Sequence, residues 1–301
     1  MSSPLAARIA AGIARPVDPA VRAFAERLAG QADAIAVLFY GSNLRTGSLE
    51  GVLDYYLLLP GPAESGIWPR VSYHEWDCAE EGGGEVLRAK VATMTLAKFA
   101  AAAAGRLTDT TIWARFVQPS ALIWRRDAAA ETAVIAALGG AATTAARLAA
   151  VVGPAAGTEA DYWTALFRAT YRAEFRVEKP GREQSILSLN ADHFEGLLPL
   201  ALTDAGVAFE RDGNRIMPAI APAERGRVLA WWNHRRRLGK PLNLLRLVKA
   251  STTFDGAARY AAWKIERHTG VPVKLTPWRE RHPILAAPGV LWSVWRARRK
   301  G

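Results

Sequence analysis

The residues that stand out for their chemistry are a Gly-Ser pair and an acid, each set beside an apolar run. Residues 35–40 predict a buried strand that ends at Gly41 and Ser42, and a second apolar run carries Asp54 near its start. Glycine lets a backbone approach a triphosphate, and the Ser42 hydroxyl can donate to phosphate oxygens. A carboxylate on the adjacent strand can hold Mg²⁺ against those oxygens. The alternative is an ordinary hairpin in which Asp54 caps a turn.

A Gly-Ser turn followed by an acid-bearing strand resembles the core of nucleotidyltransferases. Many of these enzymes carry a second acid two residues along the strand, where this chain has Tyr56. One carboxylate rarely holds the magnesium of a nucleoside triphosphate alone, so we expect a second acid from elsewhere in the chain. Without one, the chain would be a degenerate, non-catalytic copy.

Composition favours an ordered protein with a substantial core. The chain has 301 residues, of which 50% are hydrophobic and 22% charged, enough for one large or two modest domains. Its one cysteine, Cys78, excludes an intramolecular disulfide framework. We expect no transmembrane span, because the apolar stretch 128–157 is mostly Ala and Gly and contains Glu131 and Arg147. We expect no secretory signal at the N-terminus.

The charge is strongly uneven. The net charge is +11, and residues 231–301 carry 16 Lys and Arg against three acids, a balance of +13 that leaves −2 for the rest. Such a segment favours polyanions, either nucleic acid or an anionic membrane. Within it, 231–237 and 292–300 place tryptophans beside cations, as at a lipid headgroup zone. A packed helix with a solvated basic face is the alternative.

The pattern predicts an α+β fold in which a mixed sheet is flanked by helices. Strands are expected at 35–40, from Asp54 onward, and at 71–78, 86–94 and 115–124. Helices are expected at 16–30, 96–106, 131–152, 161–175, 185–202, 225–237, 242–248, 254–269 and 291–299. Asp212-Gly213-Asn214 predicts a hairpin turn, and a helix followed by a hairpin is compatible with a winged helix.

Four segments, in order, resemble the mitochondrial-type phosphatidate cytidylyltransferases, the soluble-fold CDP-diacylglycerol synthases, which have bacterial relatives. They are Tyr40–Arg45 with Leu53–Tyr56, Leu87–Val91, Ala103–Leu107 followed by Gln118-Pro119, and Tyr171–Arg176 with Asn190–Phe194. The resemblance covers roughly residues 35–200. It departs from the family at Val91-Ala92, where the family has Gly-Val, and at 69–73, where the family has Pro-x-His-Tyr-Ser.

This resemblance implies a three-part organisation. Residues 1–150 would form the nucleotidyltransferase core, and 151–230 a smaller helical, winged-helix-like domain that contributes Glu174. Residues 231–301 would form a basic, Trp-rich helical region that contacts a membrane surface. The implied reaction transfers CMP from CTP to phosphatidic acid, with Mg²⁺, to give CDP-diacylglycerol and pyrophosphate for phospholipid and cardiolipin synthesis. The implied location is cytoplasmic, peripheral on the inner face of the cytoplasmic membrane.

The candidate site residues follow from both lines of reasoning. Asp54 and Glu174 are the expected magnesium ligands, and Glu174 could instead form an exposed helical ion pair with its arginine neighbours. Lys90, in an apolar strand, either clamps phosphate or lies at a sheet edge. The other expected nucleotide- or phosphate-binding residues are Gly41, Ser42, Arg45, Arg106 and Arg176.

Two other functions remain open at this point. One is a nucleic-acid-directed nucleotidyltransferase or a basic nucleic-acid-binding protein, which the net charge and the possible winged helix favour. Tryptophan-rich basic segments suit a bilayer better than a groove, so nucleic acid is not the expected partner. The other is a scaffold without catalysis. His193 is expected to be a packed histidine rather than a catalytic base, since a phosphatidate phosphate is already an anionic nucleophile.

Overall fold

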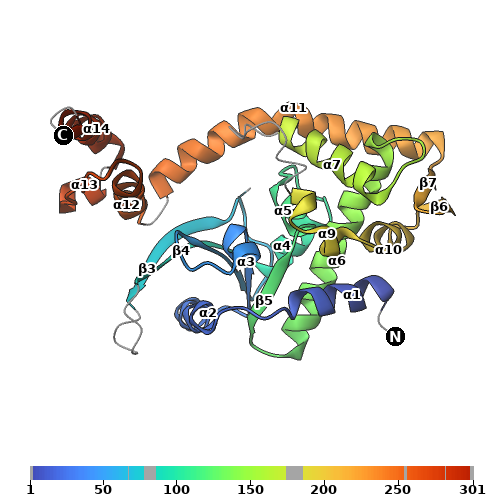
Figure 1. The fold of residues 1–301 in the computed structure, drawn as a ribbon, viewed down its shortest axis with the longest axis horizontal. Helices are drawn as coiled ribbons and strands as arrows, with labels where there is room; N and C mark the ends of the chain where they lie inside the picture. The colour runs from blue at the N-terminus through green and yellow to red at the C-terminus, as the bar shows by residue number, and fades with distance from the viewer. Residues whose placement is uncertain are drawn as a thin grey trace.

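The structure, a computed structural model, describes residues 3–66, 68–77, 86–173, 186–253, 256–281 and 283–298 (Figure 1). The main sheet contains β1 (Ala36–Tyr40), β2 (Leu53–Leu59), β3 (Arg70–Asp77), β4 (Val86–Thr95) and β5 (Ser120–Arg125). The helices before the hairpin are α1 (Pro4–Ile13), α2 (Pro19–Ala32), α3 (Ser42–Thr46), α4 (Leu96–Ala103), α5 (Thr111–Phe116), α6 (Ala128–Val152), α7 (Glu159–Ala173), α9 (Ala191–Phe194) and α10 (Leu197–Asp204). A hairpin of β6 (Ala208–Asp212) and β7 (Arg215–Ala219) precedes α11 (Pro222–Thr253), α12 (Ala257–Thr269), α13 (Pro277–Arg281) and α14 (Pro283–Arg298).

The sheet is mixed, with the strand order β3-β4-β2-β1-β5. Strands β2 and β4 are parallel, and the other neighbouring pairs are antiparallel. The parallel pair arises because the chain leaves β2, forms the edge strand β3, and then returns as β4, which lies between β3 and β2. The predicted α+β fold with a mixed sheet flanked by helices is therefore confirmed.

Helices cover both faces of the sheet, which explains why β1, β2 and β5 are nearly continuous apolar runs. On one face, α2 packs Val21 and Phe24 against the odd-numbered side chains of β1 and β2, such as Phe39 and Tyr55. On the other face, α4, α5 and α6 cover the even-numbered side chains, such as Tyr56. The second face is the one on which the candidate site forms.

Helix α6 runs through the centre of the protein and contacts α1, α4, α5, α7, α10 and α11 (Figure 1). Its alanines allow these helices to approach closely. Among the described residues it is the one helix long and apolar enough to cross a membrane, and 61% of its apolar window is buried inside the protein. The domain boundary predicted at 150/151 falls within the last turn of this helix.

The segment after α6 combines helices with the predicted hairpin. Asp212 pairs with Arg215, so Gly213 and Asn214 form a two-residue turn, and Gly213 has a φ of 57°. Positive φ at this position is what such a turn requires, and glycine adopts it without strain. The hairpin prediction is confirmed, whereas the assignment of this segment to the winged-helix type stays a prediction.

The C-terminal region departs most from the sequence expectation. The helices predicted at 225–237 and 242–248 form one helix, α11, which continues through Pro241 and contains the predicted boundary at 230/231. It contacts α6 and α7. Trp232 is 3% exposed and stacks edge-on against the buried Trp113. Arg235 donates to the Gly105 and Leu107 carbonyls. These two residues of the basic 231–237 run are therefore core anchors and not membrane contacts.

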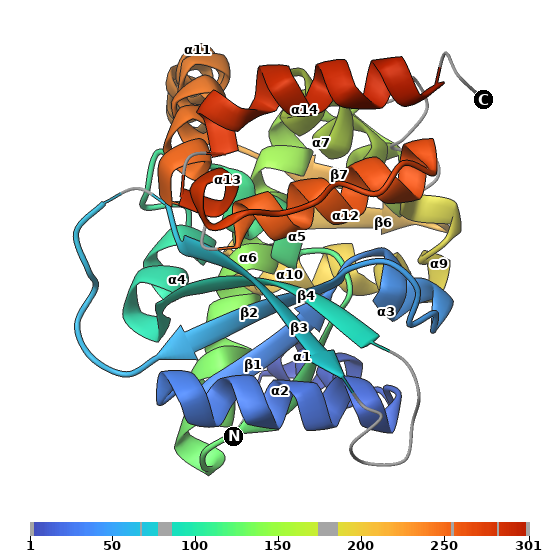
Figure 2. The ribbon, with the colours of Figure 1, turned by 90° about the vertical axis from the view of Figure 1, so that its left-hand side faces the viewer.

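Helix α12 packs over the β3 edge of the sheet, and Figure 2 shows α12 and α14 lying above β3 and β4. Tyr260 of α12 contacts Tyr73 of β3 with ring centroids 5.5 Å apart. The turn into α12 fits closely, because a Cβ at Gly256 would lie 2.9 Å from the Tyr73 carbonyl oxygen. The basic C-terminal region thus contacts the same sheet that carries Asp54.

Candidate active site

A single row of residues crosses all five strands at one level of the sheet. Its members, which we call the central row, are Tyr73, Lys90, Asp54, Tyr40 and Ser120, from β3, β4, β2, β1 and β5 in spatial order. Side chains alternate along a strand, so Tyr40, Asp54 and Lys90 lie on the same face as Leu38, Tyr56 and Ala92 of the α4–α6 side. The register therefore brings together residues that are far apart in the sequence.

Gly41 leaves open the space beside the Asp54 carboxylate. It has a φ of 93° and a ψ of −159°, a conformation essentially restricted to glycine. A Cβ at this position would lie 3.0 Å from Asp54 Oδ2. The next loop is held by the buried Asn43, whose amide donates to the Ser48 and Glu50 carbonyls. The glycine predicted from sequence is thus placed beside the predicted acid, and Ser42 is exposed next to it.

Asp54 and Lys90 are paired across the parallel strands β2 and β4. Both side chains are partly buried, and neither forms a hydrogen bond or a close ion pair with any residue that the structure describes. Burial raises the pKa of Asp54, and the positive charges of Lys90 and Arg115 partly offset this shift. Burial also lowers the pKa of Lys90, against the opposing effect of Asp54. The pair is therefore electrostatically coupled but not closed into a salt bridge.

Arg115 adds a second cation that sequence reasoning did not select. Its guanidinium lies 5.2 Å from the centre of the Tyr40 ring. Its charge lowers the pKa of Asp54, whereas burial raises the pKa of Tyr40 to about 12. The sequence had placed residue 115 at the start of a strand. The strand begins at Ser120, and Arg115 lies on the short helix α5, where Asp109 accepts bonds from the Thr111 amide and hydroxyl.

Two cations of the C-terminal helices also act on the central row. Arg246 of α11 and Lys264 of α12 each lower the pKa of Lys90 through their charge. Arg246 is held in place by donating to Thr111 Oγ1 at 3.0 Å and to the Asn243 side chain. The sequence showed that this region is basic but gave no signal that two of its cations face the sheet. Among the described residues, the charges that act on one another here are the Asp54 carboxylate and the cations of Lys90, Arg115, Arg246 and Lys264.

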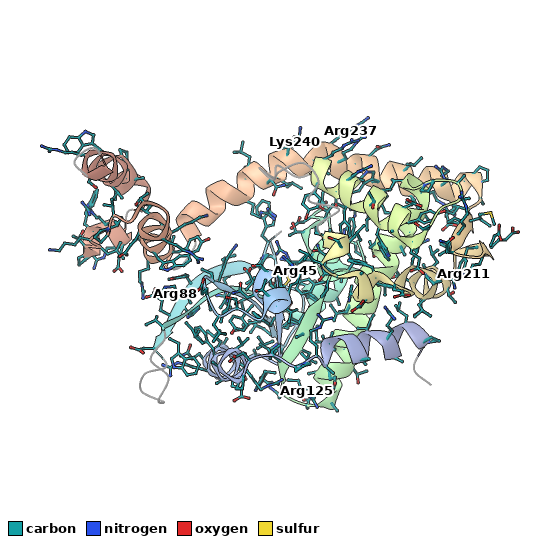
Figure 3. The ribbon with its side chains drawn as sticks, in the orientation of Figure 1. Arg45, Arg88, Arg125, Arg211, Arg237 and Lys240 are labelled. Carbon is teal, nitrogen blue, oxygen red and sulfur yellow. The ribbon has the colours of Figure 1, made fainter. Side chains whose placement is uncertain are left out.

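The remaining predicted residues are placed differently. Arg45 is partly buried on α3, in front of the sheet in Figure 3. Arg106 follows α4, is exposed, and its side chain forms no hydrogen bond or ion pair with a described residue. No contact joins the Arg106 side chain to a described residue of the central row. Glu174 and Arg176 lie outside the described residues, as does Cys78.

The donor set fits a magnesium ion that is shared with a triphosphate. Among the described residues, no three His, Cys, Asp or Glu side chains form a ready metal cluster. Mg²⁺ in nucleotide sites is commonly held by one or two carboxylates together with phosphate oxygens and water. Asp54, with open space beside Oδ2 because Gly41 lacks a Cβ, supplies one such ligand. The predicted second ligand, Glu174, is not among the described residues and stays a prediction.

His193 is a packed histidine, as its sequence context suggested. Its Nε2 lies 2.9 Å from the Val117 carbonyl oxygen. Burial lowers its pKa to about 4, so the ring is neutral at physiological pH. It packs against Phe194 and is not a member of the central row. A neutral ring whose Nε2–H is donated to a carbonyl has no role as a general base at this nitrogen.

The comparisons with known proteins add no family to this description. No family model matches the chain, and no curated protein matches it.

Proposed function

We propose that the protein is a nucleotidyltransferase that moves CMP from CTP to phosphatidic acid, yielding CDP-diacylglycerol and pyrophosphate for phospholipid synthesis. The observation that carries the proposal is the Asp54–Lys90 pair, in register on parallel strands, partly buried and not closed into a salt bridge. Because the Asp54 carboxylate and the Lys90 amine are not joined in a salt bridge, both groups are available to bind a charged ligand. The cation excess around them suits a triphosphate, and the four resembling segments favour the lipid acceptor.

The roles of the residues follow from their places. Asp54 would hold Mg²⁺, and the ion would neutralise charge on the triphosphate. Gly41 and Ser42 would let the backbone and hydroxyl approach phosphate oxygens. Lys90, Arg115 and the α11–α12 cations would bind the remaining phosphate charge. Arg45, Arg106 and Arg176 remain candidates for phosphate contact, and Glu174 for the second metal ligand.

The reaction needs positioning more than proton transfer. A phosphate oxygen of phosphatidate attacks the α-phosphorus of CTP. The bond between that phosphorus and the oxygen bridging it to the β-phosphorus breaks, and pyrophosphate leaves with the electron pair. The nucleophile is already an anion at neutral pH, so no general base is required. Catalysis by alignment and charge neutralisation is what phosphoryl and nucleotidyl transfer depend on.

An anionic membrane surface is the proposed partner, which makes the protein peripheral on the inner face of the cytoplasmic membrane. Large apolar side chains are exposed on α13 and α14: Trp278 is 55%, Leu285 69% and Trp292 58% exposed. The Arg296 guanidinium lies 5.2 Å from the Trp292 ring centre, which pairs a cation with an indole. Indole and guanidinium groups together favour the headgroup zone of anionic lipids. Figure 3 shows Arg237 and Lys240 on the outer side of α11.

The direct test is a transfer assay with labelled CTP, Mg²⁺ and phosphatidate in neutral or anionic carrier vesicles. We expect label in the lipid fraction, pyrophosphate in equal amount, and faster transfer on anionic vesicles. ATP, GTP and UTP serve as nucleotide controls, and an RNA acceptor tests nucleic-acid-directed transfer. Label on RNA and none on lipid would overturn the lipid proposal. No transfer to either acceptor from a folded protein would favour the non-catalytic scaffold.

The pH range over which kcat/KM is high should be narrower than the range set by an ordinary aspartate and an ordinary lysine. Asp54 must be ionised to hold a cation, so activity is lost as the pH falls through its pKa, which lies above the ordinary 3.8. Lys90 must be charged, so activity is lost as the pH rises through its pKa, which lies below the ordinary 10.5. A rate profile in the free-enzyme regime measures both limits. In Lys90→Arg, the alkaline limit should move upward while the acid limit stays. An alkaline limit that does not move in an active variant would remove Lys90 from this role.

Lys264→Ala should weaken CTP use although the residue lies in the C-terminal region. Its charge acts on Lys90 from α12, so its removal takes one cation from the phosphate side of the site. We expect KM for CTP to rise roughly tenfold, the effect of losing about 1.4 kcal/mol of charge-assisted binding. Lys274→Ala, in the loop between α12 and α13, removes the same charge elsewhere. Equal effects of both variants would mean that only net charge matters.

A further inference from the structure

A cavity of about 330 Å³ lies on the far side of the central row from the C-terminal helices. It is open to solvent on one side and is lined by α1, the connection from α5 to β5, α6, and the α9–α10 segment. Its apolar wall is formed by Ile9, Ile13, Phe116, Val117, Leu138 and Leu197. Small-molecule sites typically start at about 300 Å³ and are mostly apolar with a few polar groups. The cavity meets both conditions.

The polar side of this cavity is cationic. Arg8 and Arg15 line it, and neither forms an ion pair with a carboxylate of any described residue. Arg15 donates from Nε to the Gly12 carbonyl oxygen at 3.0 Å, and burial lowers the pKa of its guanidinium. Arg8 donates to backbone carbonyls of the α9 segment, among them that of Asp192 at 3.1 Å. Asp192, the one acid among the described residues that line the cavity, is exposed.

His193 and Gln118 complete the polar lining without adding negative charge. The His193 ring is neutral, and its Nε2 is engaged with the Val117 carbonyl. Gln118 donates from its amide nitrogen to the Ala114 carbonyl at 3.0 Å. A partly buried arginine with no acidic partner is costly unless a ligand supplies the negative charge. The charge of Arg8 acts on the Glu159 carboxylate, whereas Arg15 forms no ion pair with a described acid, so the cavity combines an apolar wall with the positive charge of Arg15.

The cavity is separated from the Asp54–Lys90 pair by aromatic rings. Phe116 lines the cavity, and its ring lies 5.4 Å from that of Tyr40 and 5.2 Å from that of Tyr56. Ser120, the last member of the central row, also lines it. A ligand here would lie beside the proposed active site without contacting Asp54 or Lys90.

We propose that this cavity is a binding site for a single-chain amphiphilic anion. The alkyl chain lies against the apolar wall, and the carboxylate or phosphate head accepts hydrogen bonds from Arg15. The same chemistry is offered by a free fatty acid and by a lysophosphatidate. The proposal rests on the cavity alone and does not depend on the nucleotidyl transfer proposed above.

The test uses a variant that fills the cavity and a matched control that does not. Gly12 lines the cavity, and a Cβ there meets nothing within 4 Å, so Gly12→Leu adds a large side chain to the cavity lining without a clash at Cβ. Leucine also favours a helix over glycine, which protects the fold. Gly30→Leu makes the same change on α2, where a Cβ likewise meets nothing within 4 Å. Arg15→Gln removes the charge while retaining donors.

Binding of laurate, lauroyl lysophosphatidate and uncharged monolaurin is measured by calorimetry on the full chain, below micelle-forming concentrations. We expect at least one anion to bind roughly tenfold tighter than monolaurin, and Arg15→Gln to remove that advantage. Gly12→Leu should weaken anion binding by a similar factor, and Gly30→Leu should leave it unchanged. The anion that binds more tightly shows whether the ligand is a free fatty acid or a lysophosphatidate. Equal binding of anions and monolaurin, or a folded Gly12→Leu protein that binds as the wild type does, would overturn the proposal.

Discussion

The Asp54→Asn variant should lose cytidylyl transfer by roughly a thousandfold or more while its melting temperature stays equal or rises. The loss follows because the amide cannot supply the negative oxygen that holds the metal. The equal or higher melting temperature follows from the direction of the pKa shift of Asp54. Burial is the largest influence on Asp54 and raises its pKa, so the ionised carboxylate disfavours the folded state at neutral pH. The neutral amide removes that cost.

The measurement pairs initial rates of transfer to phosphatidate with thermal unfolding of the protein alone. Asp18→Asn is the control, because Asp18 caps α2 by accepting from the Ala20 amide and asparagine caps about as well. It should keep both its rate and its melting temperature. A folded Asp54→Asn enzyme with near wild-type turnover would take Asp54 out of the site.

Gly41→Ala should reduce transfer by roughly a hundredfold, since small displacements of a reacting group can cost that much. The new Cβ would lie 3.0 Å from Asp54 Oδ2 and would push the carboxylate from its place. The backbone at φ 93° also disfavours alanine, at about 1–3 kcal/mol of unfolding free energy. The variant therefore loses both stability and activity, and the two effects must be separated.

Gly61→Ala separates them. Gly61 has a φ of 97°, close to that of Gly41, but a Cβ there meets nothing within 4 Å. It should lower the melting temperature through backbone strain and leave turnover of the folded enzyme unchanged. If both variants lose activity in proportion to their loss of stability, the crowding of Asp54 has no catalytic consequence.

The local sequence pattern was sufficient to predict the two strands β1 and β2 and the turn at Gly41 between them. The apolar runs around Gly41 and Asp54 are short, continuous and separated by turn residues, so their structure depends on nearby sequence. Lys90 was found for a related reason, because a lysine inside an apolar strand is conspicuous. The parallel pairing that sets it beside Asp54 was not predictable, since it depends on β4 entering between β2 and β3.

The residues that sequence reasoning missed are those placed by tertiary packing. Arg115 lies in a stretch of β-branched and aromatic residues that resembles a strand, and Asp109 bonds favour a short helix instead. Arg246 lies beyond Pro241, where local rules end a helix. Packing of α11 along α6 and α7 overrides that rule and carries Arg246 to the sheet. Helix α1, which lines the cavity, was likewise not expected from its sequence.

The central row has a consequence for how this protein tolerates insertions and deletions. Its members come from five separate strands but share one level of the sheet. Loss of one residue within β4 upstream of Lys90 would turn the lysine to the α2 face and bring an apolar neighbour into its place. Loss of a residue between strands would leave the row intact. Insertions and deletions that preserve activity should therefore be absent from β1, β2 and β4 and confined to the connections between strands.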